Sequence, residues 1–289
     1  MTVSLPVAVK VADPSPLAAI GLLQEAERLS RMKHAGIVKL VGVSVTAFRQ
    51  AAHCRGSLRD RLKELRKSVV KTEGADFSKC SPFHTSQAVR ILAQVAEALA
   101  YLHERRWCHR DVAARNVLVS GRDLLDSDLV VKMADFGLTV RDIPGRILKM
   151  SGPIPYTHMP PEAFHDNAIP GTFSAESDVW SFGVLCWEIQ SVGLDPHYGK
   201  SIPQVVNDLK KPGIGLLVPG SINDFFYEEI MLKCWRYYSN DRPPFYTSSR
   251  LDKRTTIPQL LAELTRRLEE DPLEEDRPIE ILKLPQMLL

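Results

Sequence analysis

Hydrophobic positions recur at helical spacing over several stretches of the chain. Between residues 85 and 105 the apolar side chains fall on one helical face, at Ile91, Leu92, Val95, Leu99 and Leu102. We expect that face to be buried. The stretch 178–191 is apolar on nearly all sides, which is typical of a helix inside a core. The same reasoning predicts further helices over about residues 17–33, 56–67, 224–236 and 256–270.

Short apolar runs predict strands between these helices, at residues 5–12, 36–45, 117–119 and 130–133. The last two are joined by a polar turn, which favours a hairpin. The elements indicate an α+β chain with a smaller part (1–54) and a larger, mainly helical part (55–268). Residues 269–289 begin with acidic, proline-interrupted sequence and are expected to form a flexible tail.

Composition narrows the class of protein. A net charge of +2 gives no reason to expect a nucleic-acid partner. The five cysteines are scattered and form no CxxC pair, which favours a reducing compartment and argues against a disulfide framework or a zinc site. No apolar stretch is long enough to predict a membrane span, and the N-terminus lacks a signal-peptide pattern. We expect a cytoplasmic protein, or the intracellular part of a larger receptor.

Two motifs carry the candidate chemistry: HRDVAARN at 109–116 and DFG at 135–137. Asp111 is a carboxylate that can accept a hydroxyl proton, Asn116 is an amide that can hold a magnesium ion, and Asp135 can bridge metal to phosphate. Phosphoryl transfer depends mainly on positioning and charge neutralisation, which such groups provide. A lone loop aspartate is usually only a solvated carboxylate, so the prediction rests on the two motifs together.

Further motifs follow in a fixed order: VAVK ending at Lys10, Glu25 on the first predicted helix, then PPEAF (160–164), SDVWSFGVLCWEI (177–189) and RPPF (242–245). With the two catalytic motifs they resemble the protein kinase family over about residues 1–268. The resemblance implies a two-lobed kinase-like fold with a small, β-rich, incomplete N-lobe, and ATP and Mg²⁺ as cofactors. It also implies that a Lys10–Glu25 ion pair aims the lysine at ATP phosphates. Otherwise, these two residues would be an exposed edge-strand lysine and a solvated helix glutamate.

The catalytic motif also indicates the class of kinase. Serine/threonine kinases usually carry a lysine two residues after the catalytic aspartate; here Ala113 stands there and the cation is Arg115. This pattern, with Pro155 before the PPE motif, is similar to that of protein tyrosine kinases. It implies protein substrates with tyrosine hydroxyls, and Arg115 as a phosphate-neutralising cation. The alternative for Arg115 is a surface arginine that caps a turn.

Other matched residues imply structural roles in this family. Glu162 and Arg242 resemble a buried ion pair, and Asp178 resembles an acceptor for catalytic-loop backbone N–H groups.

The chain departs from the family pattern in four places. No glycine-rich loop precedes Lys10, residues 42–58 lack the apolar run that leads to the adenine-binding hinge, and residues 138–155 contain no tyrosine. His158 stands where the family commonly has tryptophan. These departures leave two alternatives open: a pseudokinase that acts as a binding module, and a sequence whose start and hinge were lost in assembly. Regulatory domains outside this chain are compatible with both the enzyme and the pseudokinase.

Overall fold

The computed structural model describes residues 9–12, 15–43, 56–71, 83–121, 123–142, 155–167, 173–209, 216, 222–247 and 252–279. The sequence-based expectations for the glycine-rich region, most of the hinge segment and residues 143–154 of the activation segment therefore lie outside the described residues. So do residues 72–82 of the loop that follows the second helix.

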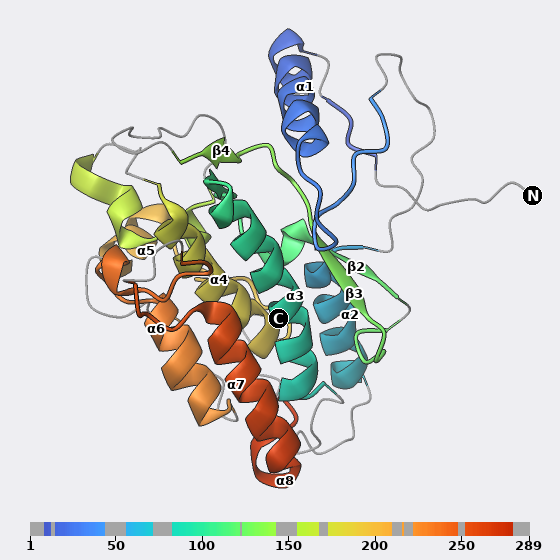
Figure 1. Cartoon of the computed structure of the whole chain (residues 1–289), viewed down its shortest axis with the longest axis vertical. Helices are drawn as coiled ribbons and strands as arrows, with labels where there is room; N and C mark the ends of the chain where they lie inside the picture. The colour runs from blue at the N-terminus through green and yellow to red at the C-terminus, as the bar shows by residue number, and fades with distance from the viewer. Residues whose placement is uncertain are drawn as a thin grey trace, which may run out of the picture.

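A long helix, α3 (Thr85–Glu104), lies at the centre of the larger part of the molecule (Figure 1). It packs against α7 (Ile257–Glu270), α4 (Ala175–Gln190) and the hairpin strand β3 (Val130–Met133). Its apolar face is buried, as the spacing of its hydrophobic residues predicts. The helical core thus forms around one amphipathic helix whose buried face contacts elements from distant parts of the chain.

Helix α4 is buried along most of its length, from Ser177 to Gln190. Trp235 packs directly on its backbone at Gly183, where a Cβ atom would stand 2.5 Å from Trp235 Nε1. Only glycine leaves room for the indole, because Cβ contacts shorter than about 3 Å essentially never occur. Helix α2 (Leu58–Lys71) buries Leu58 and Leu62 in the same core.

Two short antiparallel pairs provide the strands. β2 (Val117–Ser120) pairs with β3 in the register Val117↔Met133 to Ser120↔Val130, so the expected hairpin forms. β1 (Trp107–Cys108) pairs with β4 (Val140–Arg141). These pairs bracket the segments that carry both catalytic motifs.

The strand expected over 36–45 does not form within residues 36–43. Ile37 makes a single parallel bridge to Met133, and the residues on either side of it have no strand geometry. A strand requires a partner along its length, and the bridge with β3 ends after one residue. Residues 9–12, the described part of the run 5–12, are likewise not a strand.

Helix α1 (Pro16–Ser30) projects from the end of the helical body nearest β4 (Figure 1). Ser15 caps it by accepting a hydrogen bond from Ala18 N–H at 3.1 Å, and Pro16 occupies the first turn, where its missing N–H costs nothing. Glu25 is its buried residue and points toward the DFG motif. Leu17 and Ile20 are exposed on the same helix.

The late helices differ from expectation in two places. The helix expected over 224–236 contains a π-helical stretch, Phe226–Met231, before the short α6 (Leu232–Cys234). Helix α5 (Ile202–Leu209) was not predicted, since eight residues are too few for a clear periodic pattern.

Residues 271–279, which belong to the expected flexible tail, pack against the larger part of the molecule. Asp271 caps α8 (Pro272–Glu275), and Asp276 Oδ1 accepts a hydrogen bond from Ser86 N–H at 2.8 Å. Ile279 is buried and its N–H bonds to Phe83 O at 2.8 Å. Thus the segment covers the N-terminal end of α3 because it satisfies backbone groups there, which its acidic composition does not reveal.

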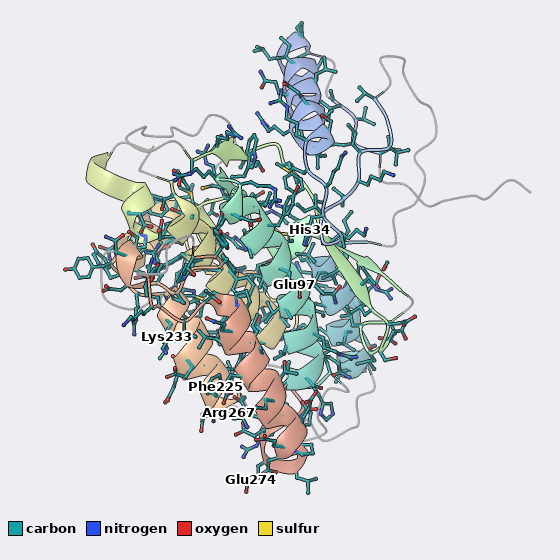
Figure 2. The ribbon with its side chains drawn as sticks, in the orientation of Figure 1. His34, Glu97, Phe225, Lys233, Arg267 and Glu274 are labelled. Atoms are coloured by element: carbon teal, nitrogen blue, oxygen red, sulfur yellow. The ribbon has the colours of Figure 1, made fainter. Side chains whose placement is uncertain are left out.

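Figure 2 labels Glu274 in this segment and, further along the same side of the molecule, Arg267 of α7 and Phe225. The Arg267 guanidinium lies 4.3 Å from the centre of the Phe225 ring, a cation–π contact that joins α7 to the start of the π-helical stretch.

Candidate active site

Asp178 of α4 anchors the backbone of the loop that follows β1. This fully buried carboxylate accepts hydrogen bonds from His109 N–H at 2.7 Å and Arg110 N–H at 2.8 Å, and it contacts His103 Nε2 at 3.0 Å. Burial by itself would raise the pKa of Asp178, but the hydrogen bonds and the charge of His103 outweigh it and lower the pKa. An ionised Asp178 therefore holds the loop backbone in place, the role that the sequence resemblance implied.

Three of the predicted site residues meet in one hydrogen-bonded cluster. Asn116 Nδ2 donates to Asp111 Oδ2 at 2.7 Å and to the Asp111 carbonyl at 2.8 Å. Arg115 Nη2 forms an ion pair with Asp111 Oδ1. The 3₁₀ turn Ala114–Asn116 brings these side chains back toward Asp111, so both carboxylate oxygens are held in a defined orientation.

The other three predicted residues form a second group. Lys10 Nζ lies 2.7 Å from both Glu25 Oε2 and Asp135 Oδ1. Burial would lower the pKa of Lys10, but the two carboxylates raise it overall. Burial would likewise raise the pKa of Asp135, yet Lys10 and the Gly137 N–H lower it. Lys10 thus pairs with both carboxylates and bridges α1 and the DFG motif.

The backbone around Asp135 is fixed by several contacts. Asp135 has a φ of +58°, a left-handed conformation that aspartate tolerates better than most residues. Glu25 Oε1 accepts a hydrogen bond from Phe136 N–H at 3.1 Å, and the buried Phe136 ring packs edge-on against His109 at 5.0 Å. Ala134 N–H bonds to Asn116 O at 2.8 Å, which connects the two groups of site residues through the backbone.

Arg28 belongs to this arrangement, although the sequence analysis did not select it. Its Nη1 donates to the carbonyls of Phe136 at 3.0 Å and Gly137 at 2.9 Å. The available signal was its place three residues after Glu25, which puts both on one face of α1.

The side-chain oxygen atoms of Asn116 and Asp135 suit a hard divalent cation. Asn116 directs its amide nitrogen to Asp111, which leaves the amide oxygen for a cation, and Asp135 supplies a carboxylate. Oxygen ligands of this kind match Mg²⁺, which commonly takes one or two protein ligands together with phosphate and water oxygens. Within the described part of the chain no group of three His, Cys, Asp or Glu could hold a metal. A cation here would therefore depend on phosphate and water for its other ligands.

Two further contacts involve the segment around the PPE motif. Glu162 and Arg242 form the expected ion pair, with Nη1–Oε1 at 2.7 Å and Nη2–Oε2 at 2.8 Å. Glu188 Oε2 accepts a hydrogen bond from Ala114 N–H at 2.7 Å and lies 3.2 Å from His158 Nε2.

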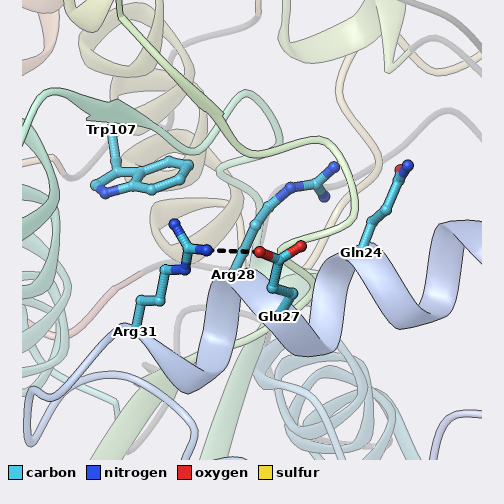
Figure 3. Close-up of a pocket in the computed structure, with 5 residues that line it drawn as sticks. All are labelled: Gln24, Glu27, Arg28, Arg31 and Trp107. Carbon is cyan, nitrogen blue, oxygen red and sulfur yellow. Dashed lines mark hydrogen bonds and ion pairs between the residues drawn. The ribbon is translucent and has the colours of Figure 1, made fainter.

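A pocket between α1 and β1 contains none of the six predicted site residues. Gln24, Glu27, Arg28, Arg31 and Trp107 line it, and Arg31 is paired with Glu27 at 2.6 Å (Figure 3). The pocket is next to the candidate site, since Arg28 contributes to both.

A family model described as protein tyrosine and serine/threonine kinase matches residues 1–250. The chain belongs to this family. Its relatives include the insulin-like receptor of Caenorhabditis elegans, 33% identical over 82% of this chain and 12% of the receptor. The tyrosine protein-kinase src-1 of the same organism is 33% identical over 83% of this chain and 42% of the relative. Human tyrosine-protein kinase FRK is 34% identical over 84% of this chain and 45% of the relative.

These comparisons confirm the recognition of a kinase domain that resembles tyrosine kinases, and they do not favour the pseudokinase alternative. The α+β class is also confirmed, with short strands and a mainly helical larger part. Membership of this kinase family implies ATP, a divalent metal and protein substrates. The chain spans less than half the length of each of these relatives. Among the described residues, no helix is long and apolar enough to cross a membrane.

Proposed function

We propose that this kinase-family chain is a protein tyrosine kinase catalytic region, which transfers the γ-phosphate of ATP to tyrosine hydroxyls of protein substrates. One observation carries the proposal. Asp111 is held by Arg115 and Asn116, and this cluster is joined through the Asn116–Ala134 backbone bond to the Lys10–Glu25–Asp135 bridge. Core packing alone would not bring these charged groups together.

In this proposal Asp111 orients the acceptor hydroxyl and takes its proton as the oxygen attacks the γ-phosphorus and the bond to the β-phosphate breaks. Arg115 remains beside Asp111 and offsets the negative charge on the transferred phosphoryl group. Lys10, aimed by Glu25, binds the α- and β-phosphates.

Asn116 and Asp135 are the residues that would hold Mg²⁺. When bound, the ion would supply positive charge that neutralises the phosphates. Lys10 contacts Asp135 Oδ1 at 2.7 Å, so the lysine orients one carboxylate oxygen while the other stays available. The Lys10–Asp135 contact thereby links the phosphate-binding and metal-binding roles.

Tyrosine as acceptor is supported by Ala113 and Arg115 in the catalytic loop, by Pro155, and by relatives whose names describe tyrosine kinases. Phosphoamino-acid analysis of a reacted protein mixture tests it. We expect mainly phosphotyrosine, and mainly phosphoserine or phosphothreonine would refute this acceptor.

Asp111→Asn tests the chemistry, in protein supplied with a glycine-rich strand pair before Lys10. Proton acceptance and alignment contribute about 10²–10⁴-fold, so transfer should fall by that factor while thermal stability stays near that of the parent. Asp252→Asn is the matched control, since this aspartate pairs with Arg254 on the surface. Transfer by Asp111→Asn within a few-fold of that control would remove Asp111 from the role.

We further propose residues 1–268 as the catalytic domain, with a partial N-lobe over 1–54 and a C-lobe over 55–268. Segment 271–279 is then an extension docked on the C-lobe. A cytoplasmic location and regulatory domains outside this chain complete the proposal. They are supported by the cysteine pattern and by the small share of each relative that the chain covers.

A further inference from the structure

His158 is a buried polar side chain. It lies in the 3₁₀ turn Tyr156–His158 and is only 3% exposed. Its Nδ1 lies 2.9 Å from the Thr157 hydroxyl, and its Nε2 lies 3.2 Å from Glu188 Oε2 on α4. The tryptophan that the family commonly carries here would fill space, whereas an imidazole adds a donor that must be satisfied.

Glu188 is a carboxylate that needs donors. It is also 3% exposed, and its Oε2 accepts the Ala114 N–H at 2.7 Å. A buried carboxylate with too few donors is costly, so a second donor beside the same oxygen lowers that cost. Ala114 begins the turn that carries Arg115 and Asn116. The carboxylate therefore lies between His158 and the catalytic loop.

The hydrogen positions follow from the partners. The Thr157 hydroxyl can donate to Nδ1, which leaves the proton of the imidazole on Nε2, facing Glu188. The Nε2 atom lies within ion-pair distance of Glu188 Oε2, but the N–H···O angle is outside the range of a hydrogen bond. Nε2 has no other hydrogen-bond partner among the described residues. A small ring rotation would close the bond.

We propose that His158 is a positioning residue that acts through Glu188 on the backbone of the catalytic loop. The Nε2–H of His158 orients the Glu188 carboxylate, which holds the Ala114 N–H and with it the turn that carries Arg115 and Asn116. The backbone of the same histidine is fixed to α4, since Ser181 Oγ donates to His158 O at 2.7 Å. The turn before the PPE motif and the catalytic loop are thus connected through one helix. The importance of the catalytic loop for catalysis rests on the proposed function, but the contact between His158 and Glu188 does not depend on that function.

The test measures the Ala114 amide directly and needs no turnover. In the ¹⁵N-labelled 289-residue chain, hydrogen exchange at Ala114 is compared for the parent, His158→Leu and His158→Gln. Glutamine places its amide nitrogen near the position of Nε2, whereas leucine fills space without a donor. We expect exchange at Ala114 to be at least about tenfold faster in His158→Leu, equal to about 1.4 kcal/mol of local opening. In His158→Gln it should return to within about threefold of the parent.

His197→Asn is the matched control, because His197 is another buried histidine nearby whose Nδ1 has no partner among the described residues. Asparagine tolerates the positive φ of 56° at this position. It should leave Ala114 exchange unchanged. Exchange in His158→Leu that matches the parent, or equal acceleration in the leucine and glutamine variants, would overturn the proposal.

Should His158→Leu fail to fold, the unaltered protein gives an independent answer. The ¹⁵N shifts of the His158 ring report which nitrogen carries the proton. A protonated Nε2 is expected, and a ring with a bare Nε2 would overturn the proposal. Because neither measurement involves phosphate transfer, a failure of the kinase function and a failure of this contact are distinguishable.

Discussion

Replacement of Glu162 should show how much the stability of the fold depends on the charged partner of the buried Arg242 guanidinium. Arg242 is fully buried, and Glu162 is 19% exposed. Besides the two bonds to Glu162, Arg242 donates to the carbonyls of Arg236 at 2.9 Å, Glu176 at 2.9 Å and Tyr237 at 3.3 Å. Its guanidinium carbon also lies 5.0 Å from the centre of the Trp180 ring.

The magnitude follows from what remains after the change. Breaking a buried ion pair on one side typically costs about 3–5 kcal/mol, because the other charge is left without compensation. Three carbonyls still accept from Arg242 and Glu162 is partly exposed, so we expect about 3 kcal/mol for Glu162→Ala. Glu162→Gln keeps one acceptor oxygen and should cost about 1.5–2 kcal/mol. At roughly 2–4 °C per kcal/mol, Glu162→Ala should lower Tm by roughly 6–12 °C.

Urea unfolding followed by tryptophan fluorescence is the suitable assay, since Trp180 lies beside the guanidinium. Glu263→Gln is the control: Glu263 pairs with Arg266 and Arg267 on the surface of α7, and its loss should not shift the midpoint measurably. A Glu162→Ala midpoint equal to that of Glu263→Gln would refute the reasoning about the buried charge.

Three other predictions concern packing, pH and nucleotide binding. Gly183→Ala should destabilise the fold by about 1–3 kcal/mol, since the added Cβ would meet Trp235; an unchanged Tm would contradict the packing. Burial, with smaller effects of Lys200 and His158, lowers the pKa of His197 from 6.5 to about 4. Between pH 6.5 and pH 4 the His197 imidazole binds a proton in the unfolded chain but not in the folded one. The free energy of unfolding should therefore fall as pH drops from 6.5 to 4, by up to about 3 kcal/mol. Urea midpoints against pH should be flatter for His197→Asn, and equal slopes would contradict the assignment. No glycine-rich loop precedes Lys10 in the 289-residue chain. Such a loop donates backbone hydrogen bonds to ATP phosphates, and the loss of two of them weakens binding by about two to four powers of ten. We therefore expect this chain to bind Mg·ATP only in the millimolar range. Micromolar binding by calorimetry would contradict this.

Local features of the sequence determined the parts of the site that are close together along the chain. Asp111, Arg115 and Asn116 lie within six residues, and a single 3₁₀ turn is enough to bring their side chains together. Periodicity likewise determined α3, and a long run that is apolar on nearly all sides determined α4. The order of motifs was specific enough to indicate the kinase family from the sequence alone.

Contacts between distant residues required the tertiary structure. The bond from Arg28 to the Phe136 carbonyl and the approach of His158 to Glu188 join segments with no common local pattern. Nothing in residues 36–43 indicated that pairing would end after Ile37, because strand formation depends on the partner as much as on the strand.

The same dependence on distant contacts explains why the sequence did not predict the docking of residues 271–279. The acidic, proline-interrupted composition of this segment indicated flexibility. Its docking depends on backbone groups at the start of α3 and on the burial of Ile279, which only the tertiary structure shows. The sequence by itself thus determined the chemistry, the helices and the family. The tertiary structure decided which charges are compensated and which segments pack, because burial and hydrogen-bond partners exist only after distant parts of the chain have met.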